Sequence, residues 1–494
     1  MAGLLACWLK ERVLLITDGR YGARTSKKVD LGGVLDMHRR LRFFLAVCGA
    51  AALVGAVMLE PVSAASAASG PVTAGDTWPM FGHDPLHSGI SSDTAIGAST
   101  ATGLATRWSQ RLGTALDQPS PAVAYNAARK QTLVYEVTYT GVASAFNAST
   151  GALVWRRQVG ANVFSSPAVY GGTVYFGDNE GTLEALNAAT GAVQCTFTLP
   201  ASPPATGPGR IFSAPVVGNV DGSGPTVFFG DAGIASSTET TNGGHMWAMA
   251  GVGNTAGNCK EKWAYNNWPD KGTNGTETGV WDEPALVQDG NGAWAVVFGT
   301  SNPDGAVYAL NAVNGTRLWR FQTAQTGPDQ DVGAGPTISP PGANGLADGA
   351  VYIDGKDGIE YALDLLTGTK IWSFTLGAGS NNALAVSEAA LAGNTLAVAF
   401  AGSVFALNAT TGALIWKAAP GGTLQASPAV SGAQGNEVLF IGDLNDHEYG
   451  FALANGTRLF SAAASGKIQD SAAVANGTLY FAAGGTLYAY APRG

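Results

Sequence analysis

Charged side chains are scarce in this chain of 494 residues, since Asp, Glu, Lys and Arg together make up only 13% of it. Acidic residues outnumber basic ones, 36 to 27, and no cluster of Lys and Arg follows residue 42. A protein that binds nucleic acid needs a basic stripe to contact phosphates. The charge pattern therefore excludes that class, and we expect no nucleic-acid partner.

The N-terminal region carries the only cationic and apolar sequence of the kind that directs export. The stretch "MHRRLRFFLAVCGAAALVGAVMLEPVSAASAASG" begins at Met37 with three arginines, continues with an apolar run and ends in small residues suited to cleavage. We interpret residues 37–67 as a signal peptide and residues 1–36 as an over-extended start or a leader. A genuine leader or an uncleaved anchor is the alternative. An exported protein in the extracellular space or cell envelope, without a membrane span after cleavage, is expected.

Cysteine is almost absent beyond this region. Only Cys195 and Cys259 follow residue 67. Two cysteines in an exported chain indicate one disulfide bond. Two separate buried thiols are the alternative that the sequence leaves open.

Glycine, by contrast, is abundant, with 68 residues, and it favours tight turns between strands over helices. Part of it belongs to a recurring motif: "AFNASTGALVW" (145–155), "ALNAATGAVQC" (185–195), "ALNAVNGTRLW" (309–319), "ALDLLTGTKIW" (362–372) and "ALNATTGALIW" (406–416). Each copy predicts a strand, a turn in which Asn or Asp bonds to its own backbone, and a second strand, which ends in Trp in four of the five copies.

A second motif precedes each copy and predicts a further strand, as in "SSPAVY" (165–170), "DEPALV" (282–287) and "DSAAVA" (470–475). It occurs eight times, and each unit of about four strands and roughly 50 residues has the period of a β-propeller blade. The last unit lacks its fourth strand, which we expect from "LATRWSQ" (104–110). The sequence therefore predicts an all-β, eight-bladed propeller over residues 103–492, with the last blade completed by the N-terminal strand and residues 68–102 as a lead-in segment.

The repeat A-[FL]-[ND]-x-x-[TN]-G-x-x-x-W resembles the tryptophan-docking motif of PQQ-like (pyrroloquinoline-quinone-type) eight-bladed propellers over residues 78–492. This family includes quinoprotein alcohol dehydrogenases, proteins similar to polyvinyl-alcohol dehydrogenase, and outer-membrane assembly lipoproteins. The resemblance implies that the tryptophans dock neighbouring blades, a structural role expected for Trp108, Trp155, Trp263, Trp319, Trp372 and Trp416. It implies PQQ and Ca²⁺ as cofactors only for the dehydrogenase branch, and the adjacent cysteine pair common in that branch is missing here.

Propeller topology predicts that one face of the ring collects acidic residues. The residues that come just before the innermost strands should lie nearest the axis, and they include Asp282, Glu283, Glu388 and Asp470, our candidates for a catalytic carboxylate. Glu283, Glu388 and Asp470 are also the candidates for binding Ca²⁺, which prefers oxygen ligands. PQQ carries several carboxylates and needs basic partners, so Arg210, Lys356 and Lys467, with the aromatic Trp281, are the candidates for a cofactor site. A solvated acidic rim is the alternative.

Three functions fit these features. The leading hypothesis is an exported, monomeric binding module whose acidic loop face contacts an unknown ligand or protein partner. The second is a PQQ- and Ca²⁺-dependent alcohol dehydrogenase. The third is a carbohydrate- or polymer-binding propeller that uses Trp268, Trp281, Phe164 and Phe212 near the long loops at residues 200–212, 231–245 and 264–283. His83 and His87, which Pro85 separates, indicate the start of the propeller rather than a metal site.

Overall fold

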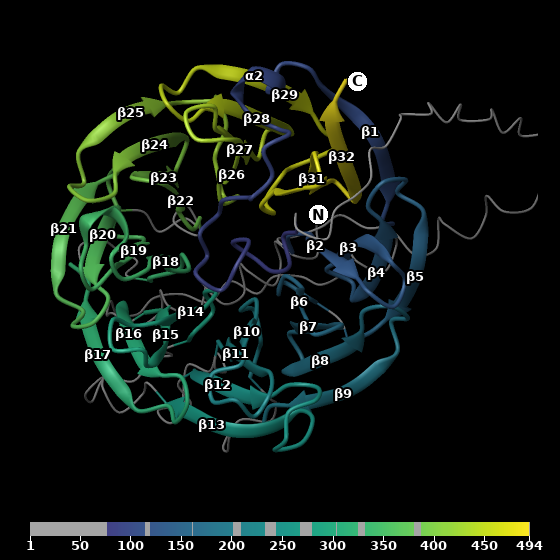
Figure 1. Ribbon diagram of the computed structural model, residues 1–494, viewed down its shortest axis with the longest axis vertical. Helices are drawn as coiled ribbons and strands as arrows, with labels where there is room; N and C mark the ends of the chain where they lie inside the picture. The colour runs from purple at the N-terminus through teal and green to yellow at the C-terminus, as the bar shows by residue number, and fades with distance from the viewer. Residues whose placement is uncertain are drawn as a thin grey trace, which may run out of the picture. The chain divides into compact units, whose positions relative to one another are not determined.

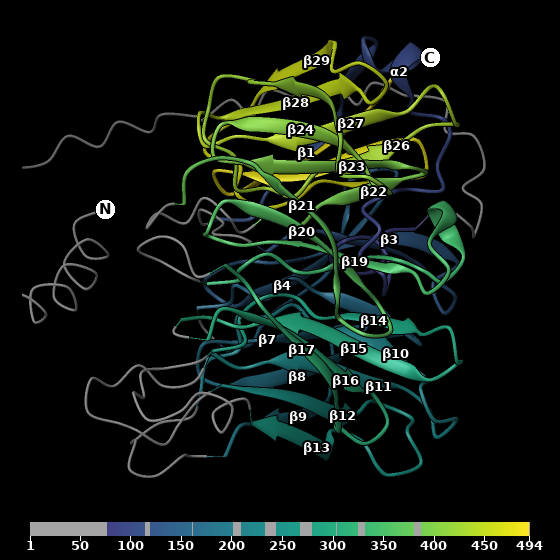
Figure 2. The same cartoon turned by 90° about the vertical axis from the view of Figure 1, so that its left-hand side faces the viewer.

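Eight four-stranded antiparallel sheets follow one another around a ring, as the computed structural model shows in Figure 1. The view turned by 90° shows most strands of the blades running between the two faces of the ring (Figure 2). The prediction of an eight-bladed β-propeller is therefore confirmed. The structure describes residues 77–113, 119–160, 162–200, 209–232, 244–266, 279–302, 304–324, 331–379 and 387–493. The predicted leader and signal peptide lie outside these residues.

The first four blades, numbered in chain order, each run from an inner to an outer strand. Their strands are β2 (Ala122–Asn126), β3 (Gln131–Val137), β4 (Val142–Asn147) and β5 (Leu153–Gln158) in blade 1; β6 (Ala168–Tyr170), β7 (Thr173–Gly177), β8 (Thr182–Asn187) and β9 (Val193–Thr198) in blade 2; β10 (Val216–Gly218), β11 (Thr226–Gly230), β12 (His245–Ala250) and β13 (Lys260–Asn266) in blade 3; and β14 (Ala285–Gln288), β15 (Trp294–Gly299), β16 (Ala306–Asn311) and β17 (Arg317–Gln322) in blade 4.

The remaining blades repeat this order, except that blade 8 takes its outer strand from the N-terminal side of the chain. Their strands are β18 (Thr337–Ser339), β19 (Ala350–Asp354), β20 (Ile359–Asp364) and β21 (Lys370–Thr375) in blade 5; β22 (Ala390–Ala392), β23 (Thr395–Phe400), β24 (Ser403–Asn408) and β25 (Leu414–Ala418) in blade 6; β26 (Ala429–Ser431), β27 (Val438–Gly442), β28 (His447–Ala452) and β29 (Arg458–Ala463) in blade 7; and β30 (Ala473–Ala475), β31 (Thr478–Ala483), β32 (Thr486–Pro492) and β1 (Leu104–Arg111) in blade 8. Two short helical turns, α2 (Ala98–Ala101) and η3 (Ala343–Gly345), complete the described elements.

Blade 8 closes the ring with strands from both ends of the propeller. β1 pairs antiparallel with β32, from Leu104 opposite Pro492 to Arg111 opposite Thr486. This pairing confirms the predicted closure. It matters because a blade without its fourth strand would leave the backbone groups of β32 unpaired at a sheet edge.

Each docking tryptophan fixes its own blade to the turn of the next blade. The indole N–H of Trp108 donates to the carbonyl of Ala148 at 2.9 Å, and its ring lies directly over Gly151 in the turn between β4 and β5. Five further tryptophans make the equivalent hydrogen bond to the following blade: Trp155, Trp263, Trp319, Trp372 and Trp416. The outer strand of blade 7 carries Phe460 at this position, and that of blade 2 carries Cys195, which pairs with Ala185 as Trp155 pairs with Ala145.

The turn that receives the tryptophan has little freedom of sequence. The Asn147 side chain accepts hydrogen bonds from the backbone N–H groups of Ser149 and Thr150, both at 3.0 Å. Gly151 follows with a φ of 70°, in the left-handed region. A Cβ at Gly151 would lie 2.7 Å from the Trp108 ring, so glycine is required for both its conformation and its lack of a side chain.

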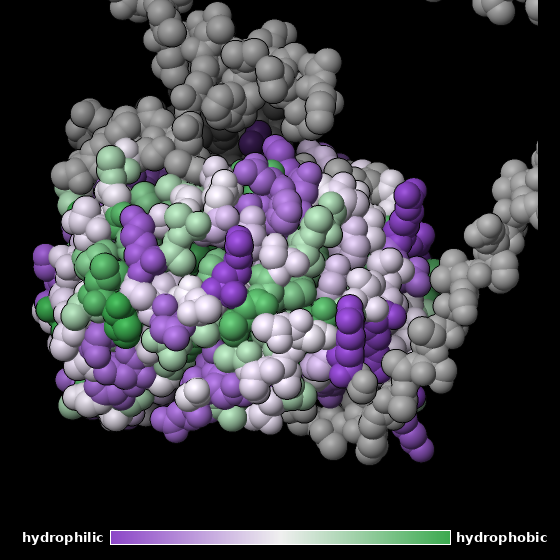
Figure 3. All heavy atoms as spheres, turned by 90° about the horizontal axis from the view of Figure 1, so that it is seen from above, coloured by the Kyte–Doolittle hydropathy of each residue, from purple (hydrophilic) through white to green (hydrophobic). Residues whose placement is uncertain are grey.

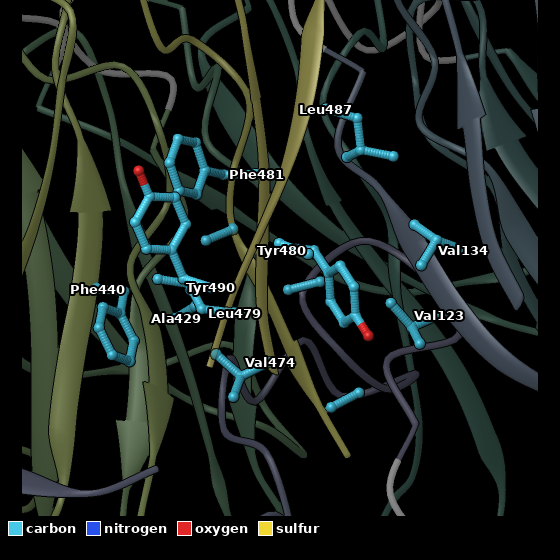
Figure 4. Close-up of a cluster of buried hydrophobic side chains, with 14 of the residues drawn as sticks. Val123, Val134, Ala429, Phe440, Val474, Leu479, Tyr480, Phe481, Leu487 and Tyr490 are labelled. Carbon is cyan, nitrogen blue, oxygen red and sulfur yellow. The ribbon is translucent and has the colours of Figure 1, made fainter. Parts of the chain in front are cut away.

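Apolar side chains fill the spaces between the blades. The largest such cluster joins blades 7, 8 and 1 and includes Phe440, Leu479, Tyr480, Val123 and Val134, all of which are buried (Figure 4). On the outside of the ring, hydrophobic residues lie scattered among hydrophilic ones (Figure 3). Within the described part of the chain, no helix has the length and apolar character needed to cross a bilayer.

A disulfide bond joins the outer strands of blades 2 and 3. Cys195 lies in β9, and Cys259 immediately precedes β13. The bond closes a loop of 64 residues that contains two of the three long connections of blade 3, residues 200–212 and 231–245. It therefore restricts the unfolded chain in the region where the blades have their longest loops.

We expect Gly151→Ala to destabilise the ring more than Gly292→Ala does. Both glycines have left-handed φ values, so either substitution costs about 1–2 kcal/mol of conformational strain. Gly292 has open space around it, whereas a Cβ at Gly151 would displace the Trp108 ring and add roughly 1–3 kcal/mol. Chemical denaturation of both variants measures the difference, and equal losses would contradict the docking role of the turn.

Candidate functional site

Eight residues at equivalent positions surround the axis just before the inner strands begin. Each stands two residues ahead of an inner strand, and the inner strands face the middle of the ring in Figure 1. We call this set the inner ring, and the face on which it lies the loop face. Its members in blade order are Ser120, Ser166, Ala214, Glu283, Gly335, Glu388, Ser427 and Ser471.

Serine hydroxyls link five consecutive blades of the inner ring. The backbone N–H of Glu388 donates to Ser427 at 2.9 Å, and that of Ser427 donates to Ser471 at 2.8 Å. In the same way, the backbone N–H of Ser471 donates to the Ser120 hydroxyl and that of Ser120 donates to the Ser166 hydroxyl, both at 2.8 Å. These hydroxyls are buried, and each accepts a hydrogen bond from the preceding blade. They therefore hold blades 6, 7, 8, 1 and 2 in register.

Residues 77–97 of the lead-in segment cross the middle of the ring and bond to most inner strands (Figure 1). Its backbone carbonyls accept from the N–H of the second residue of β6, β14, β18, β22 and β26, with distances of 2.6–2.9 Å. Trp78 forms a two-way bridge with Val123 of β2, and the Ser91 hydroxyl donates to Val474 of β30. The segment thus contacts seven inner strands through hydrogen bonds.

The lead-in segment also delivers His87 to the inner ring. Nδ1 of His87 lies 2.8 Å from Oε1 of Glu388, and both side chains are buried. Gly335 makes room for this contact, because a Cβ there would overlap with the Glu388 carboxyl. Glu283, two blades away, is partly exposed and close enough to influence both groups. His87, Glu283 and Glu388 therefore form one cluster at the axis.

Burial keeps this cluster close to neutral. It raises the pKa of the Glu283 carboxyl to about 8, and repulsion from Glu388 adds to the effect. Burial also raises the pKa of Glu388 well above its usual range and lowers that of His87 to about 4. Nδ1 of His87 and Oε1 of Glu388 lie 2.8 Å apart, but neither atom has a hydrogen bond of acceptable geometry within the described chain. Their neutral forms avoid the cost of burying two charges.

The other predicted carboxylates divide between two places. Asp282 lies beside the cluster in blade 4, where it accepts a hydrogen bond from the N–H of Gly299, and burial raises its pKa. Asp470 lies in blade 8, where it accepts from the N–H of Ala482 and interacts with Glu136 and Glu448. The structure thus brings Asp282, Glu283 and Glu388 together but leaves Asp470 in a separate group.

This division bears on metal binding. Among the residues that the structure describes, no three His, Cys, Asp or Glu side chains have a geometry that could hold a metal ion. The three carboxylates proposed for Ca²⁺, Glu283, Glu388 and Asp470, belong to two groups on different blades. Ca²⁺ requires six to eight oxygen ligands around one point.

The acidic loop face itself is less charged than the sequence suggests. Asp178, Asp304, Asp354 and Asp443 are buried on this face. The carboxylates of Asp178, Asp304 and Asp443 accept hydrogen bonds, whereas Oδ2 of Asp354 has no hydrogen-bond partner within the described chain. The described acids of this face that have appreciable exposure include Glu180, Glu283, Asp331 and Asp446. The acids are therefore mainly structural, and the alternative of a solvated rim applies only to these few.

A second set of equivalent residues lies closer to solvent, four residues ahead of the inner strands. We call it the surface ring; its described members are Phe164, Phe212, Trp281, Gly333, Gln425 and Gln469. All except Gly333 are partly exposed. The members of blades 1 and 6, and Trp268, lie outside the described residues. Neighbouring members contact each other, as the 5.2 Å separation of the Phe164 and Phe212 ring centroids shows.

The residues proposed for a cofactor do not converge. The Lys356 ammonium lies 5.3 Å from the Trp281 ring centroid and 2.6 Å from the Asp331 carboxylate, so it already has an anionic partner. Arg210 in blade 3 and Lys467 in blade 8 are both exposed, each two residues ahead of a surface-ring member. Trp281 and Lys356 are thus the only pair among these four candidates whose contact the structure records.

Sequence reasoning missed two features. It treated the stretch around His87 only as the beginning of the propeller, because nothing local indicates that the histidine meets Glu388, 301 positions later. It also used motifs such as "SSPAVY" to count strands, without comparing the residues at equivalent positions of the eight copies. Alignment of the eight copies would have revealed the serines of the inner ring and, two residues earlier, the aromatic residues and glutamines of the surface ring.

Stability should fall as the pH rises from about 4 to about 8, and Asp470→Asn should reduce that fall. Burial raises the pKa of Asp470 to about 8. In this range the folded chain keeps a proton that the unfolded chain releases, so this carboxyl costs up to about 1.4 kcal/mol per pH unit. Thermal unfolding between pH 5 and 9 measures the slope, with the exposed Glu180→Gln as control. A slope unchanged in Asp470→Asn would refute the assignment.

Solved structures with the same fold include enzymes and an assembly factor. The quinohemoprotein alcohol dehydrogenase from Comamonas testosteroni is 15% identical, with a TM-score of 0.68, and the match covers 85% of this chain and 81% of that chain. A europium-containing methanol dehydrogenase is 14% identical, with a TM-score of 0.68 and coverage of 84% and 98%. BamB from Moraxella catarrhalis is 16% identical, with a TM-score of 0.54 and coverage of 78% and 97%. At these identities the likeness shows the fold alone.

Family-level comparison is more specific. No curated protein matches the chain. The model of the family described as outer membrane protein assembly factor BamB matches residues 92–258 and 286–387, which together form more than half of the chain. The matched residues include Trp108, Trp155, Trp319, Trp372 and Cys195, whereas Cys259, Glu283 and Glu388 lie just outside them. The chain therefore belongs to this family of PQQ-type β-propellers.

Proposed function

We propose that the protein is a binding module of the cell envelope whose loop face receives a ligand or a partner. The observation that carries the proposal is the surface ring, in which equivalent positions of five blades bring partly exposed aromatic and amide side chains to the loop face. Rigid strands position these side chains, and the long blade 3 loops begin beside them. Loops and strand ends on a rigid scaffold are where binding residues concentrate.

Three features support a location in the envelope. The sequence beginning at Met37 has the composition of an export signal. The Cys195–Cys259 disulfide suits an oxidising compartment. The family takes its description from an outer membrane protein assembly factor, whose name also supports a role in contacting another molecule.

A quinoprotein alcohol dehydrogenase is the second candidate, because two of the similar structures are alcohol or methanol dehydrogenases. The described residues do not fit a PQQ–Ca²⁺ pair, however. Of the carboxylates near the axis, Asp282, Glu388 and Asp470 are buried, and no three of these groups form a metal site in the described part of the chain. Lys356 is already paired with Asp331, while Arg210 and Lys467 lie on separate blades. Binding without redox chemistry is therefore the better-supported function.

Site-specific photocross-linking tests the binding face. With p-benzoylphenylalanine in place of Phe212, which is partly exposed on the loop face, we expect a covalent adduct in the cells that produce the protein. The same group in place of Thr190, exposed in a turn on the opposite face, is the matched control and should give none. Mass spectrometry identifies the adduct. Adducts at both positions, at Thr190 alone, or at neither would count against the proposal.

The dehydrogenase alternative has its own test. We expect no change in tryptophan fluorescence when micromolar PQQ and Ca²⁺ are added to the purified protein, because the described residues offer neither a cation site nor converging cations. Primary alcohols should then reduce no artificial electron acceptor. Stoichiometric quinone binding together with alcohol-dependent reduction of the acceptor would replace the binding proposal with the enzymatic one.

A further inference from the structure

The surface ring has two chemically different arcs. Phe164, Phe212 and Trp281 occupy the position on the consecutive blades 2, 3 and 4. Gln425 and Gln469 occupy it on blades 7 and 8, on the other side of the ring (Figure 1). An aromatic arc thus faces an amide arc across the axis, and none of the six described members carries a charge.

Contacts within each arc hold the side chains in place. The rings of Tyr139, Phe164 and Phe212 follow one another with centroid separations of 5.1 and 5.2 Å. The Trp281 ring lies against the Lys356 ammonium and close to the Gly333 backbone. A side chain at Gly333 would overlap with the indole ring. On the other side, Nε2 of Gln469 donates to Oε1 of Gln425 at 3.0 Å. These groups are therefore ordered before a ligand arrives, which lowers the entropic cost of binding.

Charges near the ring are balanced or solvated. The Lys356–Asp331 pair contributes no net charge, and burial keeps the Glu283 carboxyl protonated up to about pH 8, the value to which its pKa is raised. Arg210 and Lys467 lie in water on blades 3 and 8, where salt screens them. A charged ligand would need a buried partner of opposite charge in the ring, and the described members provide none.

We propose that the surface ring binds a neutral, hydroxyl-rich ligand, a saccharide, with a sugar face on the aromatic arc and its hydroxyls toward the amide arc. This inference rests on the proposed function and specifies its ligand. Aromatic rings offer flat apolar surfaces for the C–H face of a sugar. Amides donate and accept hydrogen bonds, as hydroxyls require. Glu283 of the inner ring, two residues after Trp281 on blade 4, supplies a further hydrogen-bonding group.

Binding of defined oligosaccharides tests the inference. A glycan array containing neutral, anionic and cationic oligosaccharides identifies the preferred class, and calorimetry with cellotriose, maltotriose and chitotriose gives affinities. We expect neutral glycans to bind and oligogalacturonate and chitosan oligomers to be weaker. Phe212→Leu, which keeps apolar volume but removes the aromatic face, should weaken binding about fivefold to tenfold.

Further variants separate binding from folding. Gln469→Leu should weaken binding to a similar extent, whereas Glu283→Gln, a neutral isostere, should retain it and Glu283→Ala should not. Thr190→Ala on the opposite face should leave affinity unchanged. The melting temperature of each variant is measured alongside, so that a variant that merely unfolds is recognised.

Two results would overturn the saccharide inference. One is the absence of binding to every neutral glycan on the array by the folded wild-type protein. The other is a preference for anionic glycans that Arg210→Ala or Lys467→Ala abolishes, which would transfer recognition to the exposed cations. Either result leaves the binding-module proposal standing if the Phe212 cross-linker captures a protein, whereas absence of any adduct removes both proposals.

Discussion

Hydrogen bonds between the lead-in segment and seven inner strands, six of them between backbone groups, are the interaction on which the site depends. They attach to the second residue of most inner strands, so they hold the beginnings of these strands at one level around the axis. The pairing of β1 with β32, which follows directly along the chain, then closes the ring. Residues two and four positions ahead of the strands consequently meet as rings, although hundreds of positions separate them in sequence.

Burial of carboxyl groups is the second physical theme. Asp282, Glu283, Glu388 and Asp470 lie near the axis, and burial raises the pKa of each. An ionised carboxylate in such surroundings would lose its hydration without gaining a cation. Protonation and hydrogen bonds to backbone N–H groups, as at Asp282 and Asp470, are the less costly solution. A sequence count of acids therefore overstates the negative charge of this face.

The same fold serves enzymes and an assembly factor among the similar structures, so the fold does not decide between them. The decision depends on the side chains at the loop face. Here they combine an aromatic arc, an amide arc and buried axial carboxyl groups whose pKa values are raised. That combination suits recognition of an uncharged molecule better than retention of a highly charged cofactor.

The sequence alone determined the eight blades, the closing strand and the identity of the docking tryptophans, because a strict repeat leaves few other ways to pair the strands. It also indicated that Asp282, Glu283 and Glu388 lie near the axis, because propeller topology places the residues before every inner strand there. Only the tertiary structure decided that His87 meets Glu388, that Asp470 belongs with Glu136 and Glu448, and that the two cysteines are bonded. Those contacts join different blades or the lead-in segment, and their distances follow from ring closure and burial, which no local pattern of residues encodes.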